Sequence, residues 1–193
     1  MEVAEQIITT NTSNIKVQKR DGRLEPLDID KIHFVVEEAC EGLTGVSSSQ
    51  IEINANIQFY DGITTKDIQH VLVKSANDLI SLENPNYQYA AARLLSYDVR
   101  KEAHGQYEYI PLLKLILRNI KLGVYDRTIV EKYHKSEIKK LNTWIKRDRD
   151  LDFTYAGLRQ VVDKYLVQDR STGELYETPQ DMYMMIAGTL FAN

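Results

Sequence analysis

Cysteine is almost absent from this 193-residue chain, in which Cys40 is the only one. One cysteine excludes an internal disulfide and a zinc site built from several cysteines, and it is typical of a protein in a reducing compartment. Cys40 falls within the apolar helical pattern of Ile32, Val36 and Ala39. We therefore interpret it as a buried, inert thiol rather than a catalytic nucleophile.

Long apolar runs are absent as well. No segment approaches the length that spans a membrane, and residues 1–14 lack the basic start and apolar centre of a signal peptide. We interpret residues 1–14 as a flexible tail and expect a cytoplasmic protein without a membrane partner.

Positive charge is not in excess, because 24 Lys and Arg stand against 28 Asp and Glu, a net charge of -4. This balance argues against a dedicated nucleic-acid binder. Residues 131–150 are locally basic, with seven Lys or Arg against four acids. We interpret that run as a solvated helix face.

A cluster of cations accompanies a predicted hairpin near the start. Ile15 and Val17 alternate with polar residues, and Asp21-Gly22 is typical of a hairpin turn. Lys19 and Arg20 would then lie beside the tip, and Lys31 would lie in the first turn of a following helix capped by Asp28 or Asp30. This arrangement suits a polyphosphate. The alternative is a solvated hairpin edge that is protected from aggregation by its charges.

Four segments with helical or partly helical patterns follow the hairpin, up to Gly105. The first runs over 30–42, and residues 47–58 fit either a short helix or a strand. Thr64 and Asp67 form a capping-box pattern, which places Thr65 at a helix start, either as a plain first-turn residue or in reach of a ligand. Asn84-Pro85 would end that helix and begin another that stops at Gly105.

The remainder reads as short helices linked by polar turns. We expect a helix over 154–164, a hairpin that pairs 165–168 with 174–176, and a helix capped near Thr178. The apolar face of that last helix indicates either a truncated chain or a helix that folds back on its predecessors. The predicted fold is mainly α (α+β), with a helical unit and its β-hairpin over 15–105 and a second helical segment over 106–193.

Several motifs in colinear order resemble the N-terminal region of the large (alpha) subunit of class I ribonucleoside-diphosphate reductase. The likeness extends from about Ile15 to Asn193, and it rests on the segments 19–22, 57–63, 87–94, 105–108, 148–150 and 153–155. The resemblance implies that 15–105 is an ATP-cone, an allosteric domain that binds ATP or deoxyATP with Mg²⁺. Residues 106–193 would begin the catalytic domain and end before its barrel.

The resemblance also implies the site residues. Lys19 and Lys101 would contact phosphates, Arg20 is a weaker phosphate candidate, and Thr65 would lie against the nucleotide. The segment 25–31 would line the nucleotide, and it comprises Glu25, Pro26, Leu27, Asp28, Ile29, Asp30 and Lys31. The position of Lys101 is also explained if its charge only stabilises the negative, C-terminal end of the helix dipole.

Two positions depart from the family. Asp28 stands where many relatives have Asn, and an ionised carboxylate cannot donate a hydrogen bond. Gln69 stands where some relatives have His. Either change would alter nucleotide affinity or the discrimination of ATP from deoxyATP.

The resemblance implies partners as well, namely a small radical-generating subunit and a second large subunit. The barrel that carries the thiyl radical and the redox-active cysteines is missing, so we expect this chain alone to reduce no ribonucleotide. The alternative functions are a free-standing ATP-cone that senses nucleotides and an interaction module without ligand.

Overall fold

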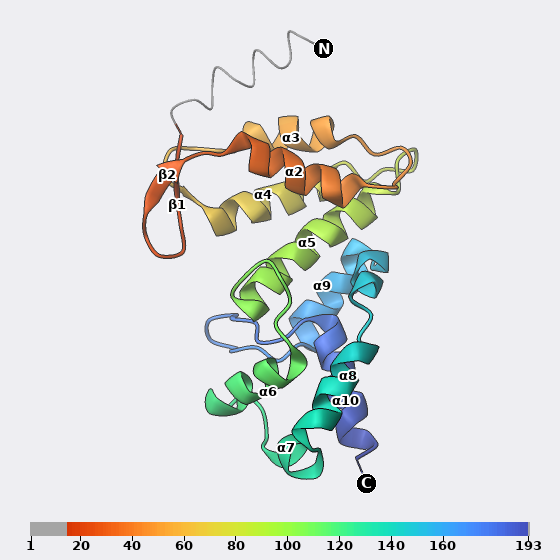
Figure 1. The fold of residues 1–193 in the computed structure, drawn as a ribbon. Coiled ribbons are helices and arrows are strands. Elements are labelled where there is room, and N and C mark those ends of the chain that lie inside the picture. The colour runs from red at the N-terminus through yellow and green to blue at the C-terminus, as the bar shows by residue number, and fades with distance from the viewer. Residues whose placement is uncertain (1–14, 193) are drawn as a thin grey trace. The chain divides into compact units, whose positions relative to one another are not determined.

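The structure is a computed structural model that describes residues 15–192, so the tail predicted for residues 1–14 lies outside the described residues. The chain divides into two compact units, one up to Leu95 and the other from Ser96. Helix α5 (Tyr87–His104) runs across this boundary (Figure 1). Helices dominate both units and the only sheet in the described part is small, which confirms the predicted mainly α fold.

The first unit holds a three-stranded sheet in the order β2-β1-β3. Strands β1 (Lys16–Gln18) and β2 (Leu24–Pro26) form the predicted antiparallel hairpin, with Val17 opposite Glu25. Gly22 in the turn has a φ of 85°, a conformation that glycine adopts without a steric penalty. Strand β3 (Ile63–Thr64) pairs parallel to β1, and the sequence did not predict it.

Three helices complete the first unit around α5. Helix α3 (Ser48–Asn56) packs against both α2 (Ile29–Cys40) and α4 (Thr65–Asp78) (Figure 1). The helical interpretation of 47–58 is confirmed and the strand interpretation is wrong. The physical reason is helical spacing, because Ile51 and Ala55 are the buried positions.

Helix ends follow local chemistry. Thr64 caps α4, since its hydroxyl accepts the Asp67 N–H at 3.0 Å, as predicted. The expected end of α4 at Asn84-Pro85 is wrong, because the helix ends at Asp78 and α5 begins only at Tyr87.

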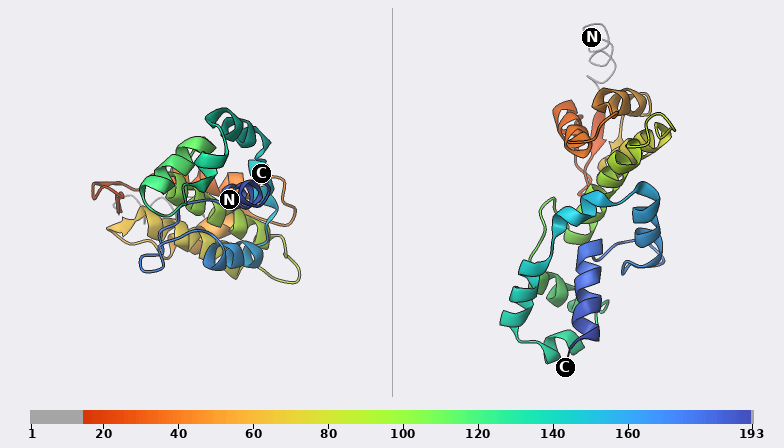
Figure 2. Two further views of the ribbon diagram at one scale, coloured as in Figure 1. Left: turned by 90° about the horizontal axis from the view of Figure 1, so that it is seen from below. Right: turned by 90° about the vertical axis from the view of Figure 1, so that its right-hand side faces the viewer.

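The second unit is built from short helices and a 3₁₀ helix, as the pattern beyond residue 106 predicted. They are α6 (Leu112–Lys121), α7 (Thr128–Lys132), α8 (Lys135–Trp144), η1 (Arg147–Asp152), α9 (Tyr155–Lys164) and α10 (Pro179–Leu190). Helix α6 lies beside α8, and η1 lies beside α10 (Figure 2). The core cluster is apolar and comprises Ile110, Leu112, Leu115, Ile116, Ile129 and Ile138.

Two expectations for the second unit need correction or completion. The hairpin over 165–176 contains a single bridge between Gln168 and Leu175 and no full strands. Its turn is organised instead by Asp169, whose carboxylate accepts the Ser171 N–H at 2.7 Å. Helix α10 does fold back in part, since Met182 is buried while Leu190 remains exposed.

No helix within residues 15–192 is both long enough and apolar enough to cross a membrane.

Candidate nucleotide-binding site

Lys19 and Thr65 follow two parallel strands. Strand β1 ends at Gln18, which pairs with Thr64, the last residue of β3. Because β1 and β3 run in the same direction, their carboxyl ends lie at one edge of the sheet, the kind of edge where ligands bind in open sheets. The structure therefore brings together two predicted site residues from distant parts of the sequence.

The hairpin face carries paired charges beside this edge. Lys19 is half-buried, and its Nζ lies 3.2 Å from Oε2 of Glu25. Arg23 holds the other carboxylate oxygen of Glu25 at 3.3 Å. Arg20 is exposed in the hairpin turn. Lys19 is thus held across the hairpin by a carboxylate that a phosphate group can replace.

The start of α2 places a second cation and a second carboxylate in this cluster. Asp28 is the N-cap, since its Oδ1 accepts the Lys31 N–H at 3.1 Å, and its Oδ2 lies 2.8 Å from Lys31 Nζ. The hydrogen bond from Lys31 lowers the pKa of Asp28, and the charge of Lys19 lowers it further. The hydrogen bond to Asp28 raises the pKa of Lys31. Asp28 and Lys31 are therefore fully charged near neutral pH.

The link from β2 to α2 supplies the other predicted residues. Pro26 pairs with Lys16 at the end of the hairpin, and the Leu27 N–H donates to the Ile15 carbonyl at 2.9 Å. Ile29 is half-buried and Asp30 is exposed in the first turn of α2. Two acids at this helix start complement the positive end of the helix dipole.

Helix α4 contributes Thr65 and Gln69. Thr65 is the first residue of the helix, whereas its neighbour Thr64 provides the cap. Gln69 Nε2 donates to the Leu94 carbonyl at 2.7 Å, so this side chain connects α4 to α5. Gln69 is thereby fixed by a backbone partner within the first unit.

Lys101 is exposed in the last turns of α5, beyond the boundary at Leu95, and belongs to the second unit. The contacts described above unite Lys19, Glu25, Asp28 and Lys31 within the first unit, whereas Lys101 lies in the second. Its role in the site stays a prediction.

Cys40 lies at the end of α2 and is partly buried. Burial raises the pKa of its thiol to about 11, so the reactive thiolate is scarce at neutral pH. This agrees with the interpretation of an inert thiol.

A buried polar network in the second unit was not predicted from the sequence. Asp181 Oδ2 accepts from His104 Nε2 at 3.1 Å, and Asp181 Oδ1 accepts from Arg147 Nη2 at 2.6 Å. The Ile110 N–H donates to His104 Nδ1, so the ring proton lies on Nε2. Despite burial, the hydrogen bonds from His104 and Arg147 lower the pKa of Asp181. The only part of this network that the sequence indicated was the capping pattern of Thr178 and Asp181.

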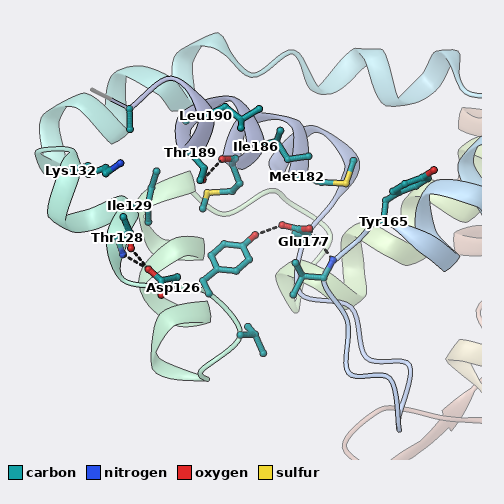
Figure 3. A pocket seen from close by; sticks show the side chains of 16 residues that line it. Asp126, Thr128, Ile129, Lys132, Tyr165, Glu177, Met182, Ile186, Thr189 and Leu190 are labelled. Atoms are coloured by element: carbon teal, nitrogen blue, oxygen red, sulfur yellow. Dashed lines mark hydrogen bonds between the residues drawn. The ribbon is translucent and has the colours of Figure 1, made fainter.

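An apolar cavity of about 610 Å³ lies between α7 and α10 in the second unit. Met182, Ile186 and Leu190 of α10 line it together with Ile129 (Figure 3). The Tyr125 hydroxyl donates to the Glu177 carboxylate at this cavity, and burial raises the pKa of both groups. Asp126, Thr128 and Lys132 also line the cavity (Figure 3).

Metal ligands are not clustered either. Within residues 15–192, no group of three His, Cys, Asp or Glu side chains is placed to hold a metal ion.

Two family models match the chain in the predicted order. Residues 15–102 match the ATP cone domain, and residues 151–193 match the all-alpha domain of ribonucleotide reductase.

Curated relatives match nearly the whole chain. Ribonucleoside-diphosphate reductase 1 subunit alpha of Escherichia coli (strain K12) is 47% identical over 180 residues, which are 93% of this chain and 24% of the relative. The corresponding alpha subunit of Haemophilus influenzae is 41% identical over 179 residues, 93% of this chain and 24% of the relative. That of Enterobacteria phage T4 is 42% identical over 178 residues, 91% of this chain and 23% of the relative.

The first unit therefore carries most of the segment that matches the ATP cone domain. Over most of its length the chain is similar to the N-terminal region of class I ribonucleoside-diphosphate reductase alpha subunits, as its motifs predicted. It spans about a quarter of the length of these relatives, 24% for the Escherichia coli protein.

Proposed function

We propose that residues 15–102 bind ATP or deoxyATP as an allosteric effector, with Mg²⁺ carried on the triphosphate. The observation that supports this function best is the cluster of Lys19, Glu25, Asp28 and Lys31 within the segment that matches the ATP cone domain. Thr65, at the same edge of the sheet as Lys19, extends the proposed site.

Binding exchanges ion partners in this proposal. The triphosphate takes the ammonium groups of Lys19 and Lys31, which are now held by Glu25 and Asp28. Charge-assisted contacts to phosphate are stronger than exposed pairs between side chains. Mg²⁺ on the triphosphate reduces the repulsion between its oxygens and the displaced carboxylates. Lys101 and Arg20 are the further phosphate contacts in this proposal.

The longer protein to which this region corresponds would be a ribonucleotide reductase large subunit in the cytoplasm. Its partners would be a second large subunit and the small subunit that generates the radical. The effector site would then control the reduction of ribonucleotides to deoxyribonucleotides, and we expect the 193-residue chain alone to be inactive.

A free-standing nucleotide sensor and a pure interaction module are the competing functions. The match of residues 151–193 to the reductase all-alpha domain and the similarity over 93% of the chain favour the reductase.

Calorimetric titration with MgATP tests the effector site. We expect the unchanged chain to bind and Lys19→Ala or Lys31→Ala to lose about ten- to a hundredfold in affinity, because each lysine makes a charge-assisted contact. Lys74→Ala is the matched control, since Lys74 is an exposed lysine on the same unit in α4. Absence of binding, or equal losses for Lys74→Ala and Lys19→Ala, would contradict the proposal.

A further inference from the structure

A groove of about 740 Å³ lies along α6 and α8 in the second unit, outside the residues 15–102 that match the ATP cone domain. Its apolar lining comes from Pro111, Leu113 and Leu117, and Leu117 is 44% exposed. We name it the α6–α8 groove. Its complete lining is Pro111, Leu113, Lys114, Leu117, Arg118, Lys121, Lys139 and Asn142.

The charged residues in this lining are all cations. Lys114, Arg118 and Lys121 come from α6 and Lys139 comes from α8, and no carboxylate lines the groove. Helix α6 contains no Asp or Glu at all, although the whole chain carries more acids than bases. The groove is thus a local concentration of positive charge on a protein with net negative charge.

Three of these cations are available to a partner. Lys114, Lys121 and Lys139 are exposed, and none of them has an ion-pair partner among residues 15–192. Arg118 differs, because its Nη2 donates to the Tyr176 carbonyl at 3.1 Å and its Nε donates to Asn119 at 3.0 Å. Burial lowers the pKa of Arg118. Arg118 therefore forms a fixed part of the wall, and the lysines provide the mobile charges.

The walls of the groove are held in place by the core. Leu112, Leu115 and Ile116 on the inner face of α6 belong to the apolar cluster of this unit. Asn142 of α8 accepts the Leu112 N–H at 2.8 Å, which fixes α8 against the start of α6. The groove is consequently a preformed surface, which lowers the entropic cost of binding.

We propose that the α6–α8 groove binds an acidic peptide segment of a partner protein, with leucine-like side chains against Leu113 and Leu117 and carboxylates paired with Lys114, Lys121 and Lys139. A peptide in a groove can present apolar and acidic side chains on one face at helical spacing. The combination of an apolar floor with a purely cationic rim matches that chemistry on both counts.

Nucleic acid and membrane fit the groove less well. Single strands bind proteins through aromatic side chains that stack on bases, and the groove lining contains no aromatic residue. A bilayer presents a flat surface, whereas the lysines and leucines of this site line a groove between two helices, a shape that admits a peptide.

Fluorescence anisotropy tests the proposal with a short labelled peptide that has leucine at every third or fourth position and glutamate elsewhere. We expect salt-sensitive binding of this peptide to the 193-residue chain and none of a matched peptide with lysine in place of glutamate. Replacing one of the three lysines by Ala should weaken binding about two- to fivefold, and Leu117→Ser should weaken it without a change in charge.

The triple variant Lys114→Glu, Lys121→Glu, Lys139→Glu should abolish binding. Its matched control is Lys135→Glu, Lys146→Glu, Lys164→Glu, which changes the net charge equally at exposed lysines outside the groove. Circular dichroism verifies that both variants are folded. If both triple variants lost peptide affinity equally, the binding would depend only on the overall charge of the protein, and the proposal would be overturned.

Three other results would also overturn it. They are no binding of the glutamate peptide, tighter groove-dependent binding of a single-stranded oligonucleotide or of phosphatidylserine vesicles, and self-association of the chain that the groove variant alone removes.

Discussion

Asp28 does two things at the start of α2. Its carboxylate accepts the Lys31 N–H as a helix cap and also pairs with the Lys31 ammonium. A phosphate at a helix start uses the same kinds of donor. At the scale of the residue, Asp28 therefore competes with the proposed effector for both donors of Lys31.

Replacing Asp28 by Asn separates these roles. Asparagine caps helices about as well as aspartate, but it has no charge to hold the Lys31 ammonium or to repel a triphosphate. We expect Asp28→Asn to tighten MgATP binding about three- to tenfold with little change in thermal stability. Calorimetric titration and a melting curve of the same samples measure both, and weaker binding would contradict this account.

Asp150 provides a prediction about pH. It is buried in η1, where Gln180 Nε2 donates to its Oδ1 at 3.0 Å while its Oδ2 has no partner. Burial raises its pKa from 3.8 to about 6. Because the unfolded chain then loses this proton at lower pH than the folded chain, the contribution of Asp150 to stability falls as pH rises from about 4 to about 6.

The variant Asp150→Asn removes this dependence. Between pH 4 and pH 7 the parent should lose up to about 3 kcal/mol of unfolding free energy that the variant does not lose. The variant should therefore become more stable relative to the parent as pH rises. Urea unfolding of both proteins at several pH values measures the difference. A difference that stays constant over this range would contradict the raised pKa.

At the scale of the element, the helix starts were the most predictable features of this chain. Thr64 and Thr178 each cap the helix that follows, as the sequence predicted. Thr154, the expected first residue of the helix over 154–164, is the N-cap of α9. A cap and its N–H partner are only a few residues apart, so the pattern is complete within a short window. The hairpin at Asp21-Gly22 was predictable for the same reason.

Features that depend on distant partners were not predictable. Strand β3 has two residues, and only its pairing with β1 defines it as a strand. His104 and Arg147 meet at Asp181 from separate elements, and nothing local to either residue indicates this. In the candidate site, the local sequence predicted Lys19, Arg20 and Lys31. The prediction of Thr65 as a ligand residue depended on the family resemblance. Its position beside Lys19 follows from the parallel pairing of β1 with β3, which the sequence did not predict.

Removing the carboxylate of Asp181 should destabilise the second unit strongly. Asp181 caps α10 together with Thr178 and accepts from both His104 and Arg147 while it is fully buried. Asp181→Ala leaves the partly buried Arg147 guanidinium without its carboxylate partner, although its Nη1 still donates to the Thr178 hydroxyl, and we expect a loss of about 3–5 kcal/mol. Urea unfolding measures it, with Thr189→Ala at the exposed end of the same helix as control. A loss as small as that of the control would show that the network contributes little.

At the scale of the whole molecule, two units with separate cores share one continuous helix. The contacts divide the chain at Leu95, whereas the ATP cone match extends to residue 102 and the sequence suggested a boundary after Gly105. Helix α5 ends at His104, and Gly105 follows with a φ of 72°. The segment 105–108 is exposed and lacks helical hydrogen bonds, which makes it the accessible connection next to this boundary.

Limited proteolysis locates the functional boundary. Cleavage requires local unfolding of several exposed residues, so a protease specific for glutamate should cut first after Glu108. We expect a resistant product of about the first hundred residues, because the second unit is built from short helices, among them the five-residue α7, with large apolar side chains such as Leu190 exposed. MgATP should slow any further digestion of this product, since a ligand that binds only the folded state stabilises it. Mass spectrometry identifies the products. Preferential survival of residues 109–193 would contradict the view that the ATP-cone unit is independently stable.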